Sequence, residues 1–159
     1  MEISSRHHLR SDAVRDIEST LESALGVTPN GDAYERVAFE GSDREVILVD
    51  GEPLVTDFGG EPFVTVRGAN ALKPERRRVV VDAGAVSFVS DGADVMRPGI
   101  AEASPDIDPE DLVVIVEETH GKALAIGRSR VASDDLLGEE GKVVDSLHHV
   151  GDELYSFSG

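Results

Sequence analysis

The stretch from Val79 to Ile100 constrains the fold of this chain more than any other segment. It begins with three valines, a β-branched run that predicts a buried strand over Val79–Val81. Asp82 then offers a side-chain cap for a short helix over Ala83–Ser90, and Gly92 ends that helix. The segment therefore predicts a compact strand, helix and glycine loop.

A second strand and a sharp turn follow directly. Val95 and Met96 form an apolar pair that predicts a short strand. Arg97, Pro98 and Gly99 predict a type II turn, because proline fixes one turn dihedral and glycine permits the positive φ that this turn needs.

These residues resemble the signature of a PUA domain, which is the RNA-binding module of pseudouridine synthases and archaeosine transglycosylases. The signature runs D-x-G-A, then S-x-G-A-x-V, then x-P-G, and the matching residues are Asp82, Gly84, Ala85, Ser90, Gly92, Ala93, Val95, Pro98 and Gly99. The alternative is an unrelated mixed fold that shares this turn chemistry. The resemblance implies that structured RNA is the ligand.

The remainder of the chain resembles the small two-part proteins of the malignant T-cell amplified sequence and ligatin-like family. The hairpin pattern over Ile47–Leu54, followed by Pro62–Thr65, is similar to part of the first domain of that family. The resemblance implies an α+β fold in which a small N-terminal α/β domain (1–74) precedes a C-terminal PUA-type β pseudo-barrel with short helices (75–159). It also implies a role on the small ribosomal subunit in placing or releasing tRNA, with a partner that carries an initiation-factor-like domain.

Composition sets independent limits on the function. The chain has 159 residues and no cysteine, which excludes disulfides, thiolate nucleophiles and zinc–thiolate sites. No apolar run approaches the length of about 18 residues that a membrane span needs. We expect a soluble, cytoplasmic protein without a cofactor.

The formal net charge of −17 is extreme for this length, and only three of the 15 basic residues are lysines. A surface dense in carboxylates and poor in lysine keeps a protein hydrated in concentrated salt, where self-repulsion is screened. The acidic residues are spread along the chain, which favours a salt-loving archaeal source. An acidic protein that binds a basic partner is the alternative.

The charge is also uneven along the chain. Residues 1–66 and 101–159 sum to −9 and −10, whereas residues 67–100 sum to +2. Arginine presents a planar fork of donors to phosphate, and glycine turns let backbone N–H groups approach a sugar–phosphate chain. A basic linker that pairs with acidic neighbours is the other interpretation of Arg76–Arg78. The predicted RNA-binding residues are Arg76, Arg77, Arg78, Gly84, Ala85, Gly92, Ala93, Met96, Arg97, Pro98 and Gly99.

The other elements follow from periodicity and turn signals. We expect a helix from Ser11 to about Leu25 that Gly26 stops, then the strands 34–39, 44–49, 52–58 and 63–66, with residues 69–74 as a bridge. In the second half we expect strands at 112–116, 123–129, 142–149 and 153–157, and a helix cap at Ser133. Phe88, Tyr155 and Phe157 are expected to plug the core of the barrel, and base stacking on one of these rings is the alternative.

Catalytic and metal-binding patterns are unconvincing. The pairs His7-His8 and His148-His149 are adjacent, and neighbours in a strand point to opposite faces, so neither pair forms a metal clamp. We expect His148 or His149 to be a strand residue with one face in solvent. We therefore expect a non-catalytic RNA-binding protein in translation; the alternatives are an RNA-targeting subunit of a tRNA- or rRNA-modifying enzyme and a protein-interaction module that binds no RNA.

Overall fold

A computed structural model describes residues 1–159, and the N-terminal half is built around one amphipathic helix and a sheet. The helix α1 (Ser11–Leu25) buries Ile17, Leu21 and Leu25 along one stripe. Gly26 ends it at φ 74°, and its N–H bonds to the carbonyl of Glu22. The helix and its stop are as the sequence predicts.

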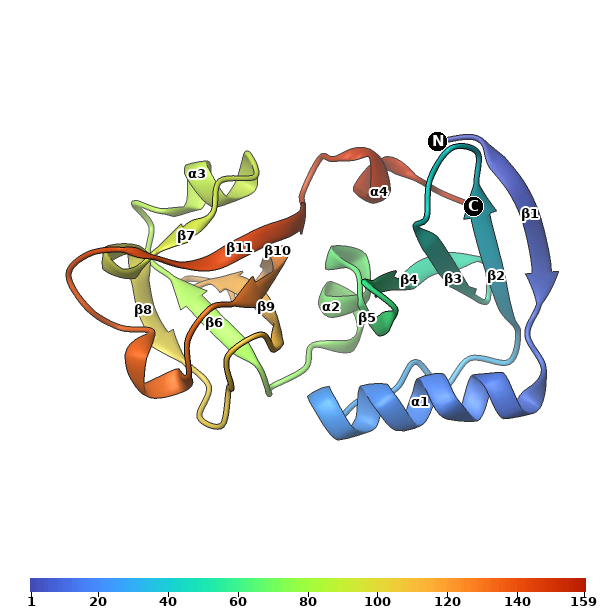
Figure 1. Ribbon diagram of the computed structural model, residues 1–159, viewed down its shortest axis with the longest axis horizontal. Coiled ribbons are helices and arrows are strands. Elements are labelled where there is room, and N and C mark those ends of the chain that lie inside the picture. Colours follow the sequence, from blue (N-terminus) through green and yellow to red (C-terminus); the bar gives the residue numbers. More distant parts are fainter.

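The first sheet is an antiparallel meander in the order β1-β2-β3-β4-β5, which lies at one end of the molecule (Figure 1). Every strand pairs with the next along the chain: short turns join the strands from β2 to β5, whereas α1 connects β1 to β2. Its strands are β1 (Ile3–His8), β2 (Tyr34–Phe39), β3 (Glu45–Val49), β4 (Glu52–Phe58) and β5 (Glu61–Val64).

A second helix, α2 (Val66–Leu72), replaces most of the predicted bridge over 69–74, so that prediction is wrong. The predicted strand over 63–66 is confirmed only for Phe63 and Val64, which lie in β5. The Thr65 side chain accepts a hydrogen bond from the N–H of Gly68 and so caps the helix. Gly68 lies so close to β4 that a Cβ there would be 2.0 Å from the carbonyl oxygen of Leu54. Tight packing on the sheet, which the local pattern does not reveal, stabilises this short helix.

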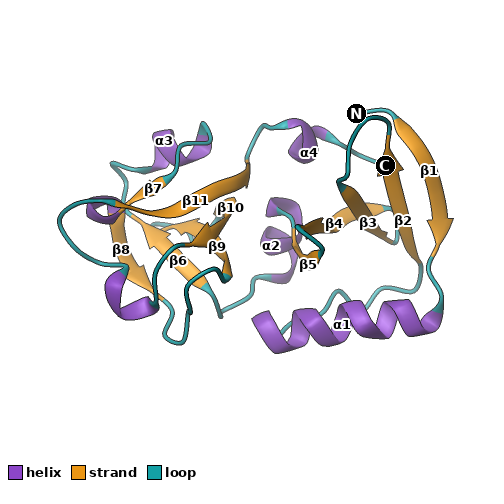
Figure 2. Ribbon diagram, viewed as in Figure 1, coloured by secondary structure: helices purple, strands orange, loops and turns teal.

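The second sheet has six strands in the order β7-β11-β10-β9-β6-β8 and curls into a partly closed barrel at the other end of the molecule (Figure 2). Only β6 and β9 run parallel; the other neighbours are antiparallel. Its elements are β6 (Arg78–Val81), α3 (Val86–Ser90), β7 (Val95–Met96), the 3₁₀ turn η1 (Arg97–Gly99), β8 (Ile100–Ala103), β9 (Leu112–Glu117), β10 (Ala123–Ser129), η2 (Ser133–Asp135) and β11 (Lys142–His149). The predicted α+β class is confirmed.

The two sheets share one hydrophobic core, and α2 lies between them (Figure 1). This core joins Ile17, Val55 and Phe63 of the first half to Val114 and Ile126 of the barrel. A second cluster of 13 buried residues fills the barrel itself. Because buried apolar area holds the halves together, the pairing of the two sheets is part of the fold.

The chain ends in a helix, α4 (Glu153–Ser156), and the predicted closing strand over 153–157 is wrong. Asp152 caps this helix by accepting a hydrogen bond from the N–H of Tyr155. Leu154 and Phe157 pack on the first sheet, where the ring of Phe157 lies edge-on to Phe39 at 5.0 Å. Phe157 therefore does not plug the barrel, and the C-terminus lies beside β2 (Figure 1).

His148 links the barrel to α2 from inside the protein. Its side chain is 1% exposed, so of the two histidines in β11 it is His149, which is half-buried, that has a face toward solvent. Its Nε2 accepts the N–H of Val66 at 3.1 Å, which leaves the proton on Nδ1 to bond Asp152 at 2.8 Å. Burial lowers the pKa of His148 below its usual value, although the Asp152 carboxylate opposes this shift.

Two smaller features complete the fold. The Ser133 side chain does not cap η2; its oxygen accepts the N–H of Ile107 at 2.6 Å and so pins a neighbouring loop.

None of the helices is both long and apolar enough to span a bilayer.

Candidate nucleic-acid interface

An open pocket of about 590 Å³ lies between α3, β7 and η1, in the segment that carries the glycine motif. Figure 2 shows α3 as an outlying helix at the barrel end of the molecule, away from the first sheet. The pocket is lined by Asp82, Gly84, Ala85, Phe88, Val89, Ala93, Asp94, Val95, Met96, Pro98, Gly99 and Lys142.

Two large apolar side chains stand exposed at this pocket. Phe88 is 66% exposed and Met96 is 50% exposed. Phe88 therefore does not plug the core, because α3 has only five residues and buries Val89 alone. Exposed aromatic and thioether groups beside a pocket are suited to contact the flat face of a ligand.

The three glycines of the motif act in different ways. Gly92 has φ 95°, and a Cβ there would lie 2.8 Å from Nε2 of His149. Gly99 does not have a positive φ, so the predicted type II turn is wrong; the chain instead forms the 3₁₀ turn η1, which begins at Arg97 and has Pro98 as its second residue. Gly99 is required because a Cβ there would lie 2.9 Å from the Cβ of Ala85.

Gly84 differs from both, because the fold itself would accept a side chain there. It is exposed, its φ is not positive, and a Cβ would meet only Oδ1 of Asp82 at 3.4 Å. Glycine at such a position keeps space free above the backbone. Close approach of a ligand is a physical reason to keep that space.

Asp82 caps a turn and not the helix itself. Its Oδ1 accepts the N–H of Ala85 at 3.1 Å, and the helix begins only at Val86. The predicted helix start at Ala83 is therefore three residues early. The turn holds Gly84 and Ala85 at the edge of the pocket.

One ion pair borders the pocket. Lys142 donates to Asp94 at 3.0 Å, and the other oxygen of Asp94 accepts the N–H of Ser146 at 2.7 Å. The hydrogen bond from Ser146 is the main cause that lowers the pKa of Asp94 below its usual value, with Lys142 adding to it. The Asp94 carboxylate is thereby held ionised and fixed in orientation.

The guanidinium of Arg97 faces away from this pocket. Its Nε donates to the carbonyl of Asp135 at 2.8 Å, and one terminal nitrogen donates to the carbonyl of Glu140 at 2.9 Å. Gly138 and Gly141 leave room for this side chain. In this geometry Arg97 anchors the loop before β11.

The three arginines in series diverge. Arg76 lies over Gly26 at the C-terminal end of α1, where its charge complements the helix dipole. Arg77 has φ 55°, approaches Asp111 at 3.8 Å and donates to the carbonyl of Leu112 at 3.4 Å. Arg78 has no ion-pair partner and extends toward Gly121.

The structure thus brings together Gly84, Ala85, Ala93, Met96, Pro98 and Gly99 around one pocket. It places Gly92, Arg97 and Arg76–Arg78 elsewhere, although all are among the predicted site residues. Sequence reasoning missed Phe88 because it assigned that ring to the core. The signal that could have found it is the brevity of α3, which leaves only one side of the helix buried. No cluster of three or more His, Asp or Glu side chains is placed to hold a metal ion.

Comparison with known families supports the motif. Residues 77–151 match the family model described as PUA domain. An uncharacterized protein of Methanocaldococcus jannaschii is 34% identical over 100% of both chains. Translation machinery-associated protein 20 of Saccharomyces cerevisiae is 32% identical, over 95% of this chain and 93% of its own length. Malignant T-cell-amplified sequence 1-B of Xenopus laevis is 32% identical over 70% of this chain and 64% of its own.

Two solved structures are similar to this protein over nearly the whole chain. A hypothetical protein from Pyrococcus horikoshii superposes with a TM-score of 0.86 at 29% identity, and the match covers 98% of this chain and 100% of that one. A conserved PUA domain protein from Thermoplasma acidophilum gives a TM-score of 0.83 at 25% identity, over 96% and 98% of the two chains. The resemblance drawn from the glycine motif is confirmed. This chain therefore belongs to the family of two-part PUA-domain proteins that includes translation machinery-associated protein 20 and malignant T-cell-amplified sequence 1.

Proposed function

We propose that this protein is a non-catalytic RNA-binding protein that acts in translation and contacts RNA through the pocket beside Phe88. The observation that carries the proposal is the exposure of Phe88 and Met96 at a pocket within the matched PUA segment. An isolated chain gains nothing from exposing a phenyl ring, since burial of that area would stabilise it. A base that stacks on the ring supplies the missing partner.

The residues of the pocket contact different parts of the RNA. Phe88 stacks on a base, a contact worth about 1–3 kcal/mol in proteins that bind single strands. Gly84 lets the sugar–phosphate chain approach the backbone, and the Lys142–Asp94 pair forms a fixed polar edge. Recognition of this kind depends on contact and shape, so it persists in salt that screens long-range attraction.

The proposed ligand is a structured RNA with an accessible unpaired segment, either tRNA or RNA of the small ribosomal subunit. Three relatives are named for the translation machinery, which supports this choice. A cytoplasmic site of action, with the small subunit and an initiation-factor-like protein as partners, completes the proposal.

Crosslinking and sequencing of bound RNA in cells of the source organism tests the proposal, with Phe88→Ala alongside. Leu137→Ala is the matched control, because Leu137 is another apolar side chain at 50% exposure and does not line the pocket. We expect tRNA or small-subunit RNA with the parent and the control, and loss in Phe88→Ala. Co-purification of an RNA-modifying enzyme without ribosomal subunits would favour an accessory role. No RNA above background would overturn the proposal.

A further inference from the structure

A second groove, of about 680 Å³, lies between α2 and the β9–β10 hairpin and shares no lining residue with the pocket beside Phe88. Its floor is apolar, formed by Val114, Val116 and Leu124. Its rim carries Lys73 and Arg78 on one side, and the remaining polar residues are Asn70, Glu75, His120, Lys122 and Tyr155.

Positive charge gathers at this groove in a chain whose net charge is −17. Most basic side chains are paired with a carboxylate or bonded to a carbonyl. The arginines and lysines whose side chains have neither are Arg15, Arg44, Arg67, Lys73, Arg76, Arg78 and Lys122. Three of these line the groove, and Arg67 lies 5.4 Å from the ring centre of Tyr155, which lines it too. Glu75 is the one acidic residue that lines it.

The walls of the groove are held in place. Asn70 of α2 accepts the N–H of Ala123 at 2.8 Å and donates to the carbonyl of the same residue at 3.3 Å. Glu117 accepts the N–H groups of His120 and Lys122 at 2.6 and 3.1 Å and so fixes the hairpin turn. A fixed groove spares a ligand the entropic cost of ordering it.

Lys73 adds an independent observation. It occupies the left-handed cap position after α2, with φ 50°, where glycine is the favoured residue. A lysine there is disfavoured by the backbone, and no ion pair or hydrogen bond of its ammonium offsets that cost, because Lys142 is the lysine whose ammonium has such a partner. Its side chain is exposed toward the groove, where an anionic ligand would account for it.

We propose that this groove binds the sugar–phosphate backbone of RNA, as a second contact surface separate from the pocket beside Phe88. The inference rests on the proposed function and extends it. Lys73, Lys122 and Arg78 contact phosphates, and the ring of Tyr155, backed by the Arg67 guanidinium, packs against a sugar or base. An acidic peptide would use the cations but not the aromatic ring, which favours RNA.

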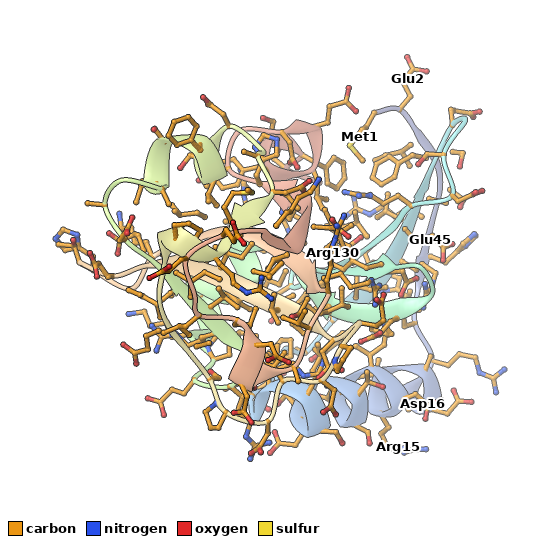
Figure 3. All side chains as sticks on the ribbon, turned by 60° about the vertical axis from the view of Figure 1, so that its left-hand side comes forward. Met1, Glu2, Arg15, Asp16, Glu45 and Arg130 are labelled. Carbon is orange, nitrogen blue, oxygen red and sulfur yellow. The ribbon has the colours of Figure 1, made fainter.

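The test is a titration of fluorescein-labelled tRNA transcript against Lys73→Gly/Lys122→Ala, over a range of KCl in which circular dichroism shows every variant folded. Glycine at position 73 removes the charge and keeps the backbone conformation. Arg15→Ala is the matched control, because Arg15 is also unpaired and is exposed on the outer face of α1 (Figure 3). Phe88→Ala is measured in parallel.

We expect the double variant to bind about tenfold more weakly for each lysine removed, as for a lost charge-assisted hydrogen bond. Its slope of log affinity against log salt should be shallower by about 0.7–0.9 for each lost contact. Arg15→Ala should match the parent. If the parent binds and Phe88→Ala weakens binding but the double variant does not, the groove proposal is wrong and the proposed function stands. If the parent binds neither this tRNA nor a transcript of small-subunit RNA, both are overturned. Displacement of the labelled tRNA by polyglutamate from the parent, but not from the double variant, would assign the groove to acidic peptides instead.

Discussion

At the scale of single residues, His148 has the greatest effect for its size, because it is bonded at both ring nitrogens. It joins the start of α2 to the cap of α4, so one imidazole connects three elements. Burial lowers its pKa, so the folded state keeps it neutral at a pH where the unfolded chain takes up a proton.

The stability of the protein should therefore fall as the pH drops below about 6.5, the value of an unperturbed histidine, and level off below the lowered pKa of the folded state. Asp152 acts in a separate, lower window: burial would raise its pKa, but the N–H groups of His149 and Tyr155 lower it. Denaturant unfolding from pH 8 to pH 5 measures the effect. The His148→Gln variant should be less stable than the parent at pH 8, and its stability should change little with pH over the same range. An equal pH dependence in parent and variant would show that His148 is not responsible.

The glycines show how far sequence reasoning reaches at this scale. Their positions in the motif predict that Gly84, Gly92 and Gly99 matter, and two of them prove essential to the backbone. The physical reason why Gly99 must be glycine was not predictable, because its contact with Ala85 joins residues from two elements. The role of Arg97 was not predictable either, since the carbonyls that accept hydrogen bonds from its guanidinium lie about 40 residues further along the chain.

At the scale of elements, α1, most strands and the strand–helix–glycine order follow from periodicity and turn residues. The two α-helices that the sequence does not predict are α2 and α4, both too short to show a helical period. Each is stabilised by a capping side chain and by packing on the first sheet, which is tertiary information. Asp152 and Thr65 were readable as caps, but nothing local separates a capped turn from a loop.

The helix α4 gives a prediction at this scale. Leu154 is 3% exposed and packs with Val37, Phe39, Val46 and Leu48 of the first sheet. Leu154→Ala should destabilise the protein by about 2–4 kcal/mol, because it removes buried methyl groups and leaves a cavity. Guanidinium unfolding at constant ionic strength measures this, with Leu147→Ala as an exposed control. A loss no larger than that of the control would mean that α4 does not dock in solution.

At the scale of the whole molecule, the fold joins two sheets through one core and carries a surface crowded with carboxylates. Most of the 32 acidic side chains have no arginine or lysine within 4.0 Å. Their mutual repulsion opposes folding at low ionic strength and is screened in concentrated salt. A salt-loving source and the domain limits 1–74 and 75–159 stay predictions.

The thermal midpoint should therefore rise steadily between 0.2 and 2 M KCl, where the Debye length shrinks from about 7 Å toward about 2 Å. Glu139→Gln/Glu140→Gln, which neutralises two exposed and unpaired carboxylates, should raise the midpoint at low salt and reduce its salt dependence. A midpoint that does not change with KCl in the parent would refute the role assigned to charge repulsion.

Hydrogen–deuterium exchange of the parent protein, with and without saturating tRNA transcript, locates the RNA interface without any variant. We expect slower exchange over residues 82–99, around Phe88 and Met96, and unchanged exchange in α1. The hairpin turn at 118–122 should be protected as well if the second groove also contacts RNA. Saturated binding without protection at 82–99 would contradict the assignment of this pocket as the RNA interface.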